Sequence, residues 1–403
     1  MTLPSPQTPT VPRSRLLQKV ESDASNLRQS PSPLALTTAA AIQQGWVRHL
    51  TLLSLALFLV SCDRPPVAPE TAPEELVKSG APALLTFQEG HMGTEFTLRV
   101  WAGPEELVAA KAAVAEAFAR IEALEMVFSD YEVDSEIVRL TTHPPGEAVP
   151  ISSDLFAMLV KTQTLSEETG GAFDVTVGPM VRLWRQARKN HRLPTAERIA
   201  EARERSGWQK LRLDRETPAV ILDAKFMQLD FGGIAKGFAA DEAMKILKQH
   251  GFARSLVAAS GDIVVGDPPP DHDAWRIGIR SLDVVMANDP DKPLTGSVPL
   301  IQGAISTSGD TQQAVNIDGV RYSHIVDTKT ALGLTHRIAV TVIGPDATTT
   351  DSYATTVSVL GKERGLAFIE SKPGVECLIL EADDAGTITE TRSSRFPEIA
   401  RGE

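Results

Sequence analysis

Hydrophobic positions follow two different periods along the chain, and together they predict a protein of strands and helices. Alternation in "TEFTLRVWA", residues 94–102, predicts a strand with one buried face. After Gly103 and Pro104 the period becomes helical, and a proline is tolerated at that place because the first turn of a helix needs no backbone N–H. The apolar positions of this predicted helix are Leu107, Val114, Phe118, Ile121 and Leu124.

The same patterns continue through the rest of the chain. Residues 151–171 predict a second helix that ends at Gly170 and Gly171, and residues 219–251 predict a strand, a glycine turn and a helix that Gly251 ends. Further strands are predicted within 255–267, 275–282, 337–345 and 374–383. Because helices and strands do not alternate strictly, we predict the α+β class, with one large mixed-sheet domain over residues 84–403.

One apolar run near the N-terminus does not fit this domain. Leu50–Val60 is preceded by Arg48 and His49 and followed by Ser61 and Cys62. The run is too short to cross a bilayer and is typical of a signal-peptide core, which predicts a signal peptide over residues 47–61. "LVSC" also resembles the lipobox of bacterial lipoproteins, in which the cysteine is acylated. The alternative is a buried amphipathic segment.

The segments around this signal are polar. Residues 1–46 are rich in Pro, Ser, Thr and Gln, which predicts either a disordered extension or a start assigned too early, with Val47 as one possible true start. Residues 62–83 are rich in Pro, Ala and Glu and suit a flexible tether after the lipid-anchored cysteine. Asp63 resembles an inner-membrane retention signal. We therefore expect a protein anchored to the inner membrane on its periplasmic side.

Composition excludes two classes of protein. The 403 residues carry a formal net charge of −12 with a pI near 5.3, and no Lys/Arg cluster occurs, which argues against nucleic-acid binding. The two cysteines, Cys62 and Cys377, provide no disulfide framework and no cysteine metal site. Cys377 lies in an apolar run and is predicted to be a core residue.

Three stretches carry candidate chemistry. "LDFGGIAKG", residues 229–237, predicts a strand ending at Asp230, a glycine turn and a helix with Lys236 in its first turns. This arrangement suits an anion site, but a glycine turn before a helix is also common without any function. "STSGD", residues 306–310, precedes "YSHIVDTKT", where His324 is either a proton acceptor or a structural residue.

The third stretch is "TTTDSYATT", which places Asp351 and Thr355 one helical turn apart. Hard oxygen ligands in this arrangement suit Mg²⁺, although an aspartate that caps a helix is the equal alternative. By contrast, the basic start of the charged segment 185–208 is predicted to be a solvated helix face.

The order of motifs is more specific than any one of them. "HMGTEF", "YEVDSEI", "TGGAFDVTVGPMVRLW", "LDFGGIAKGFAAD", "ASGDI", "STSGD", "YSHIVDTKT" and "DSYATT" together closely resemble the ApbE family of FAD:protein FMN transferases, from about residue 90 to the end of the chain. Members of this family are periplasmic or membrane-anchored, often through a lipobox cysteine.

The resemblance implies roles for single residues. His324 matches the histidine for which a base role is implied, and the Mg²⁺ site maps to Asp351 and Thr355 with backbone oxygens near Gly233 and Ala354. The implied FAD contacts are Met92, Tyr131, Ala172, Phe173, Asp174, Asp230, Lys236 and Val326. By this resemblance the protein moves FMN from FAD onto a Thr or Ser hydroxyl of exported flavoprotein subunits and releases AMP.

Two departures from the family pattern stand near these residues. Thr328 and Ala331 replace the usual Pro and Gly after Asp327, so that a stiff turn is lost beside His324, and Ser260 replaces the first glycine of the usual G-G-D. Two other functions remain open on the sequence: an FAD pyrophosphatase that uses water as the acceptor, and a lipoprotein that carries flavin without chemistry. The Mg²⁺ ligands argue against the carrier.

Overall fold

The computed structural model describes residues 80–279, 282, 296–309, 314–383 and 385–400. Contacts divide the chain into residues 1–62 and residues 63–403, and all described residues belong to the second unit. The predicted signal peptide, Cys62 and nearly all of the predicted tether lie outside the described residues, as does Asp310. Within the described ranges, no helix combines the length and the apolar character that crossing a bilayer requires.

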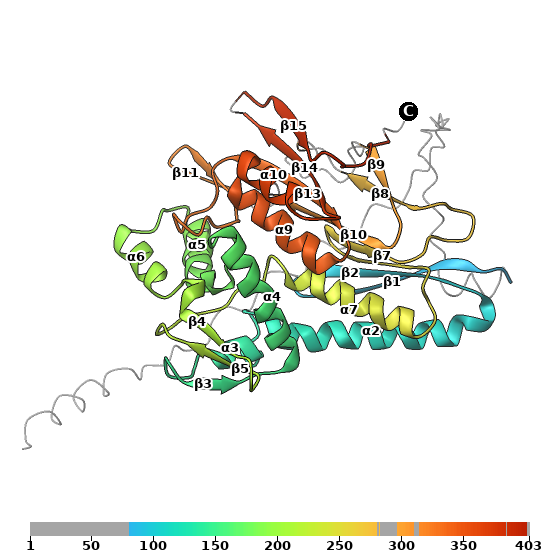
Figure 1. Ribbon diagram of the computed structural model, residues 1–403, viewed down its shortest axis with the longest axis horizontal. Helices are drawn as coiled ribbons and strands as arrows, with labels where there is room; N and C mark the ends of the chain where they lie inside the picture. The colour runs from blue at the N-terminus through green and yellow to red at the C-terminus, as the bar shows by residue number, and fades with distance from the viewer. Residues whose placement is uncertain (1–79, 280–281, 283–295, 310–313, 384, 401–403) are drawn as a thin grey trace, which may run out of the picture. The chain divides into compact units, whose positions relative to one another are not determined.

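An eight-stranded sheet forms the centre of the fold, in the order β1-β2-β6-β7-β10-β13-β14-β15 (Figure 1). All its neighbouring strands pair antiparallel. The strands are β1 (Ala83–His91), β2 (Thr94–Ala102), β6 (Ser255–Ala259), β7 (Asp262–Val265), β10 (Gly303–Gly309), β13 (Arg337–Gly344), β14 (Glu376–Ala382) and β15 (Ile388–Arg392). The α+β class is confirmed. The prediction of a mixed sheet is wrong, because all neighbouring strands of the large sheet pair antiparallel.

A row of helices covers one face of this sheet. The row runs α2 (Leu107–Phe128), α7 (Ala235–Gln249), α9 (Ala347–Leu360) and α10 (Lys362–Glu370), each packed against the next. The largest buried cluster lies between α2, α7 and the sheet, with Phe96, Leu98, Ile121 and Leu247 among its fully buried members. On the other face a second cluster includes Trp275, Ile277 and Val298 from the hairpin of β8 (Trp275–Ile279) and β9 (Gly296–Leu300).

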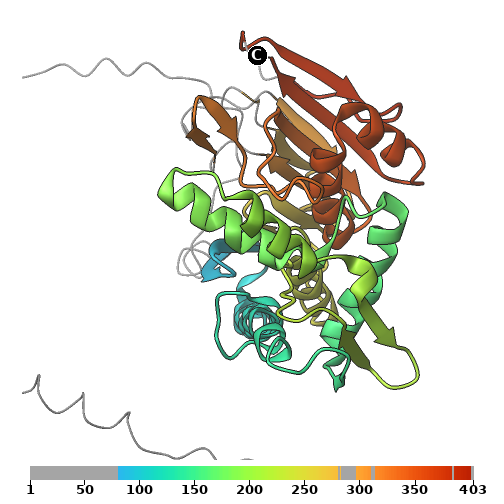
Figure 2. The same cartoon turned by 90° about the vertical axis from the view of Figure 1, so that its left-hand side faces the viewer.

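The remaining elements lie beyond one end of α7, as Figures 1 and 2 show. They comprise α3 (Glu136–Leu140), α4 (Ser153–Thr169), α5 (Gly178–Asn190) and α6 (Ala196–Glu204), the sheet of β3 (Ala148–Pro150), β5 (Ala219–Leu222) and β4 (Leu211–Asp214), and the hairpin of β11 (Val315–Ile317) and β12 (Val320–Tyr322). Short 3-10 turns stand at Pro104–Glu106, Val175–Val177 and Trp208–Lys210.

Most predicted elements occur where the periodicity places them. Helix α4 ends at Gly170, whose φ of 61° is left-handed, and Gly251 follows α7 with a φ of 90°. The predicted strand end at Asp230 is wrong: residues 227–230 belong to no strand, and the Asp230 N–H donates to the Val175 carbonyl at 2.8 Å. A single backbone bond to a 3-10 turn replaces the expected ladder.

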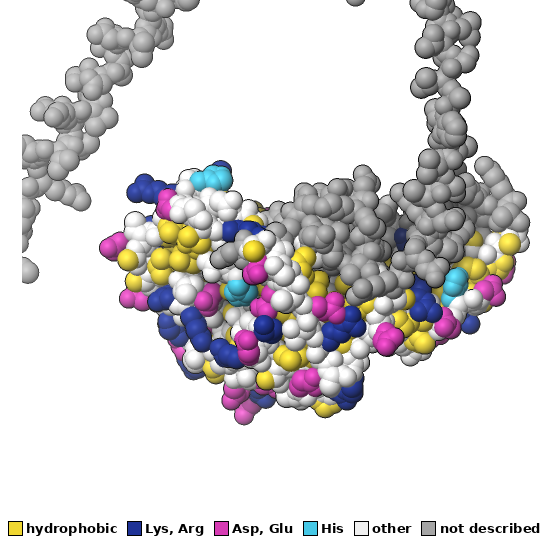
Figure 3. All heavy atoms as spheres, turned by 90° about the horizontal axis from the view of Figure 1, so that it is seen from above, with side chains coloured by type: hydrophobic (Ala, Val, Ile, Leu, Met, Phe, Trp, Pro, Cys, Tyr) yellow, Lys and Arg dark blue, Asp and Glu magenta, His cyan; other side chains and the backbone are white. Residues whose placement is uncertain are grey.

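Charge on the surface is mixed. On the face shown in Figure 3, basic and acidic side chains are interspersed.

Candidate functional site

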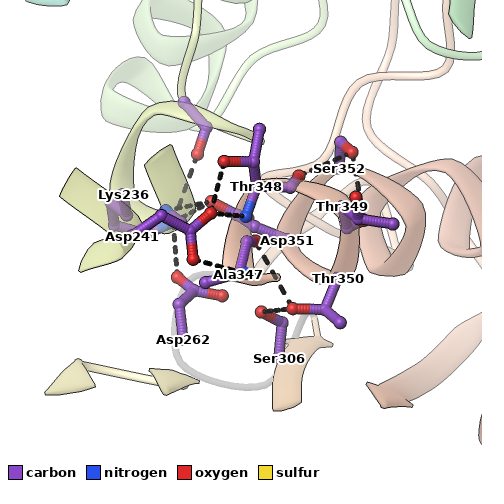
Figure 4. Close-up of polar contacts among 12 residues, drawn as sticks. Lys236, Asp241, Asp262, Ser306, Ala347, Thr348, Thr349, Thr350, Asp351 and Ser352 are labelled. Atoms are coloured by element: carbon purple, nitrogen blue, oxygen red, sulfur yellow. Dashed lines mark hydrogen bonds and ion pairs between the residues drawn. The ribbon is translucent and has the colours of Figure 1, made fainter. Parts of the chain in front are cut away.

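Lys236 is the centre of a buried ion-pair cluster built from three elements (Figure 4). Its Nζ lies 2.9 Å from Asp262 Oδ2 and 3.3 Å from Asp351 Oδ2. Lys236 stands in the first turn of α7, Asp262 begins β7, and Asp351 lies inside α9. Asp262 occurs in the "ASGDI" motif, but sequence reasoning assigned it no role.

Two carboxylates share the one ammonium group in this cluster. Asp262 and Asp351 are each only 4% exposed. Burial raises the pKa of Asp351 to about 7, and the charge of Asp262 adds to the effect while Lys236 opposes it. Burial alone would lower the pKa of Lys236, but Asp262 and Asp351 outweigh burial and raise it. The cluster therefore carries more negative than positive charge when both carboxylates are ionised.

The "KGFAAD" sequence brings α7 and α9 close enough for this contact. A Cβ on Gly237 would overlap the Ala347 carbonyl and lie 2.9 Å from the Asp351 Cβ, and the Gly237 N–H donates to Asp351 Oδ2 at 3.1 Å. One turn later, Asp241 accepts hydrogen bonds from the backbone N–H groups of Ala347 and Thr348, each at 2.8 Å. Asp241 thus satisfies free donors at the start of α9.

The residues expected to hold Mg²⁺ lie together beside this cluster. Asp351 and Thr355 are one turn apart on α9, and Gly233 faces Thr355 so closely that a Cβ on it would lie 2.9 Å from the Thr355 hydroxyl oxygen. The helix cap is Asp346, whose side chain accepts from the Thr349 N–H, so Asp351 is not the cap. Ala354 is buried on the same helix.

The donor chemistry of this group suits a small hard cation. Within the described ranges no three His, Cys, Asp or Glu side chains are arranged to hold a metal ion. A site here would therefore combine the Asp351 carboxylate with the Thr355 hydroxyl and backbone oxygens, the oxygen ligands that Mg²⁺ takes alongside waters and substrate phosphates. With Asp351 ionised, the excess negative charge of the Lys236 cluster favours a cation, and the fit is good on these grounds.

His324 lies in the loop that follows β12 and has an unusual environment. Its Nδ1 is buried and has no hydrogen-bond partner in the described part of the chain. Burial lowers the pKa of His324 to about 4, and the positive charges of Arg188 and Lys236 lower it further. The imidazole is therefore neutral at pH 7 and can accept a proton.

The segment 169–184, which stood out in the sequence, holds the His324 loop at two points. Trp184 Nε1 donates to the Ser323 carbonyl at 2.8 Å, and the Thr328 hydroxyl donates to the Gly171 carbonyl at 2.8 Å. A Cβ on Gly333 would overlap the Ser323 carbonyl and lie 2.8 Å from the Trp184 ring, so the loop also packs tightly there. The replacement of proline by Thr328 thus adds a hydrogen bond across the site.

Three of the expected flavin contacts lie in the same segment. Ala172 and Phe173 are buried. Asp174 caps the following 3-10 turn: its Oδ1 accepts from the Thr176 N–H at 2.8 Å and its Oδ2 from the Trp208 N–H at 3.0 Å. Burial raises the pKa of Asp174, although these hydrogen bonds oppose the rise. Both carboxylate oxygens are therefore occupied by the chain itself.

Tyr131 and Asp230 are joined by Arg185, which the sequence did not single out. Tyr131 is 72% exposed, and the Arg185 guanidinium lies over its ring, 4.5 Å from the centroid. Arg185 also pairs with Asp230 at 3.1 Å and with Asp130. Burial raises the pKa of Asp230, and Asp130 adds to this while Arg185 opposes it. The expectation of a solvated face at the start of segment 185–208 is wrong for Arg185, which stands against two acids from other elements.

The other two expected FAD contacts have clear structural positions. Met92 forms the β1–β2 turn with Gly93, at φ values of 50° and 71°, and its N–H donates to Glu125 Oε1 near the end of α2 at 2.8 Å. Tyr131 follows that end of α2 by a few residues. Val326 is buried in the cluster of Trp184 and Tyr322 and pairs with Gly333 in an isolated bridge.

The structure thus gathers the expected residues into linked groups. The ion-pair cluster joins Lys236 to Asp351, with Gly233 and Thr355 beside it, and His324 lies within the field of Lys236. The sequence could not reveal Asp262, Arg185 and Asp130, because their roles depend on contacts between elements far apart in the chain. Ser306 shares a hydrogen bond with Thr350 at 2.8 Å and has a structural role.

Comparison with known proteins gives a consistent result. A family model described as the ApbE family matches residues 92–379. The FAD:protein FMN transferase of Vibrio cholerae serotype O1 is 30% identical over 351 residues, which cover 86% of this chain and 97% of that protein. The FAD:protein FMN transferase of Escherichia coli strain K12 is 28% identical, over 78% of this chain and 87% of that protein.

Solved structures agree with these relatives. The apo form of the Pseudomonas stutzeri flavinyl transferase ApbE superposes with a TM-score of 0.68 at 30% identity and covers 78% of this chain and 95% of that one. The flavin transferase ApbE from Vibrio cholerae gives a TM-score of 0.67 at 29% identity, over 78% of this chain and 98% of that one.

Proposed function

The chain belongs to the ApbE family, and from this premise we propose that it is an FAD:protein FMN transferase that attaches FMN to a Thr or Ser hydroxyl of a target protein. The observation that carries the proposal is the buried Lys236 cluster with neutral His324 next to it. A phosphoryl transfer needs charges fixed around the phosphorus and a group that takes the proton of the attacking hydroxyl. The Lys236 cluster would supply the first, and His324, whose pKa the charge of Lys236 lowers, would supply the second.

The proposed reaction is a displacement at a phosphorus atom of the FAD pyrophosphate. The hydroxyl oxygen of the target attacks the phosphorus on the FMN side of the pyrophosphate, a new P–O bond forms, and the bond to the AMP oxygen breaks. AMP leaves with the electron pair, and a ring nitrogen of His324 takes the hydroxyl proton. Because burial and two nearby cations keep this imidazole unprotonated at pH 7, it is ready to accept that proton.

We propose Mg²⁺ as the metal of this site, held by Asp351 and Thr355 with backbone oxygens at Gly233 and Ala354. When bound, Mg²⁺ would neutralise pyrophosphate oxygens and the charge that develops on them. Lys236 keeps the Asp351 carboxylate in place through its ion pair, and Gly237 does so through its N–H.

For the FAD molecule we propose contacts on both sides of the His324 loop. One part of the FAD pocket would be lined by Met92, Tyr131 and Asp230. The other part would be lined by Ala172, Phe173, Asp174 and Val326. The support is that Arg185 links Tyr131 with Asp230, and Thr328 links the loop with segment 169–184. Since the side chains of Phe173 and Val326 are buried, their part in binding would be to shape the pocket wall.

We also propose that the protein acts on exported flavoproteins from a lipid anchor at Cys62, on the periplasmic side of the inner membrane. The support is the apolar run Leu50–Val60, which ends within "LVSC", residues 59–62. In this proposal residues 47–61 are the signal peptide, residues 62–83 the tether and residues 84–403 the catalytic domain. Mass spectrometry of the native protein tests this proposal. Lipid mass on an N-terminal Cys62 supports it, and an intact unmodified sequence upstream of Cys62 defeats it.

The transfer itself is tested by incubating the protein with FAD, Mg²⁺ and a candidate target, followed by in-gel flavin fluorescence after denaturation. His324→Ala should slow labelling by roughly 10² to 10⁴, the range for a positioned general base. His272→Ala is the matched control, because His272 is an exposed turn residue outside the site. Equal labelling by the His324→Ala variant and the wild type would refute the base role.

A further inference from the structure

Arg188 lies on the face of α5 that meets the His324 loop. Trp184 and Arg188 are one turn apart on this helix and therefore point the same way. Trp184 holds the carbonyl of Ser323, the residue immediately before His324. Arg188 is thus directed toward the catalytic histidine by the same helix face that positions the loop.

Within the described part of the chain, Arg188 has no partner of its own. Its side chain forms no ion pair or hydrogen bond with the described residues, and its Nε is buried without an acceptor. Burial lowers the pKa of Arg188, and Arg185 adds to the effect, but a guanidinium stays protonated at neutral pH. A half-buried charge without a counterion is costly for the folded protein, which points to an anion that is supplied from outside.

Two other cations of the site are already paired with carboxylates. Lys236 pairs with Asp262 and Asp351, and Arg185 pairs with Asp130 and Asp230. Arg188 combines a buried guanidinium nitrogen with a charge that acts on His324, whose Nδ1 is also buried and has no partner among the described residues. The charge of Arg188 also opposes the rise that burial causes in the pKa of Tyr131, an expected FAD contact. The charge of Arg188 therefore reaches both the proposed flavin contact and the proposed base.

We propose that Arg188 is an anion-binding residue of this site and takes phosphate oxygens of the FAD pyrophosphate. The planar fork of a guanidinium matches phosphate oxygens well. The inference rests on the proposed function, in which that pyrophosphate lies next to His324. Arg188 would thus pair with the negative charge of the pyrophosphate. Lys236 cannot fully do so, because it is already paired with two carboxylates.

Equilibrium binding by the whole protein tests the proposal, with FAD and riboflavin as probes and flavin fluorescence as the signal. Riboflavin has the same ring system but no phosphate. Arg188→Gln should weaken FAD binding by about ten- to a hundredfold, the usual cost of a lost hydrogen bond to a charged group, and leave riboflavin binding unchanged. Arg188→Lys, which keeps the charge but not the fork, should lie in between.

Lys189→Gln is the matched control, because it removes the same charge from the next, exposed position of α5. It should bind both flavins as the wild type does. An equal loss of FAD and riboflavin affinity in Arg188→Gln would overturn the proposal, since the residue would then shape the pocket rather than bind phosphate. Unchanged FAD affinity with a raised KM for the target protein would also overturn it, since the anion would then belong to the target.

The binding assay requires no turnover, so its result can be separated from the proposed function. If the wild type binds FAD but transfers nothing, the transferase proposal fails. The binding of FAD and riboflavin by the Arg188 variants still decides whether Arg188 binds phosphate. A wild-type protein without affinity for FAD would overturn both.

Discussion

Ser260 and Ala331 adopt left-handed backbone conformations, at φ values of 58° and 59°, where the family pattern carries glycine. Both were noted in the sequence as departures, but their backbone cost became visible only in the structure. A residue with a Cβ pays roughly 1–2 kcal/mol in this region. Thr328, which stands where the family pattern carries proline, is compensated by its hydrogen bond to Gly171.

Ser260→Gly should therefore stabilise the protein by about 1 kcal/mol, since the relief of strain exceeds the entropy that glycine adds to the unfolded chain. Ser260 is exposed in the β6–β7 turn, so no buried contact is lost. The free energy of unfolding in urea measures the effect. Ala109→Gly, at an exposed helical position of α2, should instead lower stability by about 1 kcal/mol. A Ser260→Gly variant less stable than the wild type would contradict the strain argument.

The pH dependence of catalysis follows from His324. Its pKa of about 4, which burial, Arg188 and Lys236 lower from the usual value, means that the neutral form persists above pH 5. Activity that needs the neutral imidazole is retained above the pKa and lost as the pH falls through it. At saturating Mg²⁺, kcat/KM should therefore decline on the acid side near pH 4. A decline centred near the ordinary histidine pKa of about 6.5 would show that the imidazole is not in this environment.

Sequence spacing predicted some single residues well. Asp351 and Thr355 share one face of α9, as their separation indicated, and Lys236 stands in the first turn of the helix after the glycine loop. Arg185 and Arg188 were assigned to a solvated face because a basic helix looks the same in a sequence whether water or another element covers it. Only the packing of α5 beside Tyr131 and His324 separates the two cases.

At the scale of elements, the crossing of α7 and α9 determines the geometry of the ion-pair cluster. Gly237 permits the close approach, and Asp241 binds the first turn of α9. Helix existence and ends were predictable from apolar period and glycine stops, as α4 and α7 show. The prediction of a strand ending at Asp230 was wrong. Residues 227–230 have the apolar–polar alternation of a strand, but they pair with no neighbouring strand.

Gly237→Ala should destabilise the protein by about 1–3 kcal/mol, since the added methyl group meets the Ala347 carbonyl and the helices must separate. Thermal or urea unfolding gives the magnitude. Gly90→Ala is the control, because a Cβ at Gly90 meets no atom within 4 Å and the φ of Gly90 is not positive. Equal stability of the two variants would mean that α7 and α9 cross less closely than described.

The support of the His324 loop by α5 makes a separate prediction. Trp184→Phe keeps a ring in the core but loses the hydrogen bond to the Ser323 carbonyl, so kcat should fall about tenfold while FAD affinity changes little. Trp275→Phe loses a similar bond, to the Asp267 carbonyl at 3.1 Å, in the cluster on the other face of the sheet. That variant should keep full kcat. Equal losses in both variants would indicate general destabilisation rather than positioning.

For the whole molecule, function depends on bringing together segments that are far apart in the chain. Lys236, Asp262 and Asp351 come from α7, β7 and α9, and the sheet order places β7 beside β10 and β10 beside β13, so that these elements meet. Hydrophobic periodicity gives the elements but not their order, because alternation within a strand carries no information about its neighbours. The resemblance to the ApbE family supplied what periodicity could not, and the comparisons confirm that family.

The most direct test of the central claim is to quantify AMP and protein-bound flavin in one reaction of the wild-type protein with FAD, Mg²⁺ and a target protein. We expect AMP and covalent flavin to form in equal amounts and both to disappear when Mg²⁺ is chelated or Asp351 is replaced by Ala. AMP released together with free FMN, without flavin on the target, would contradict the account and identify a pyrophosphatase instead.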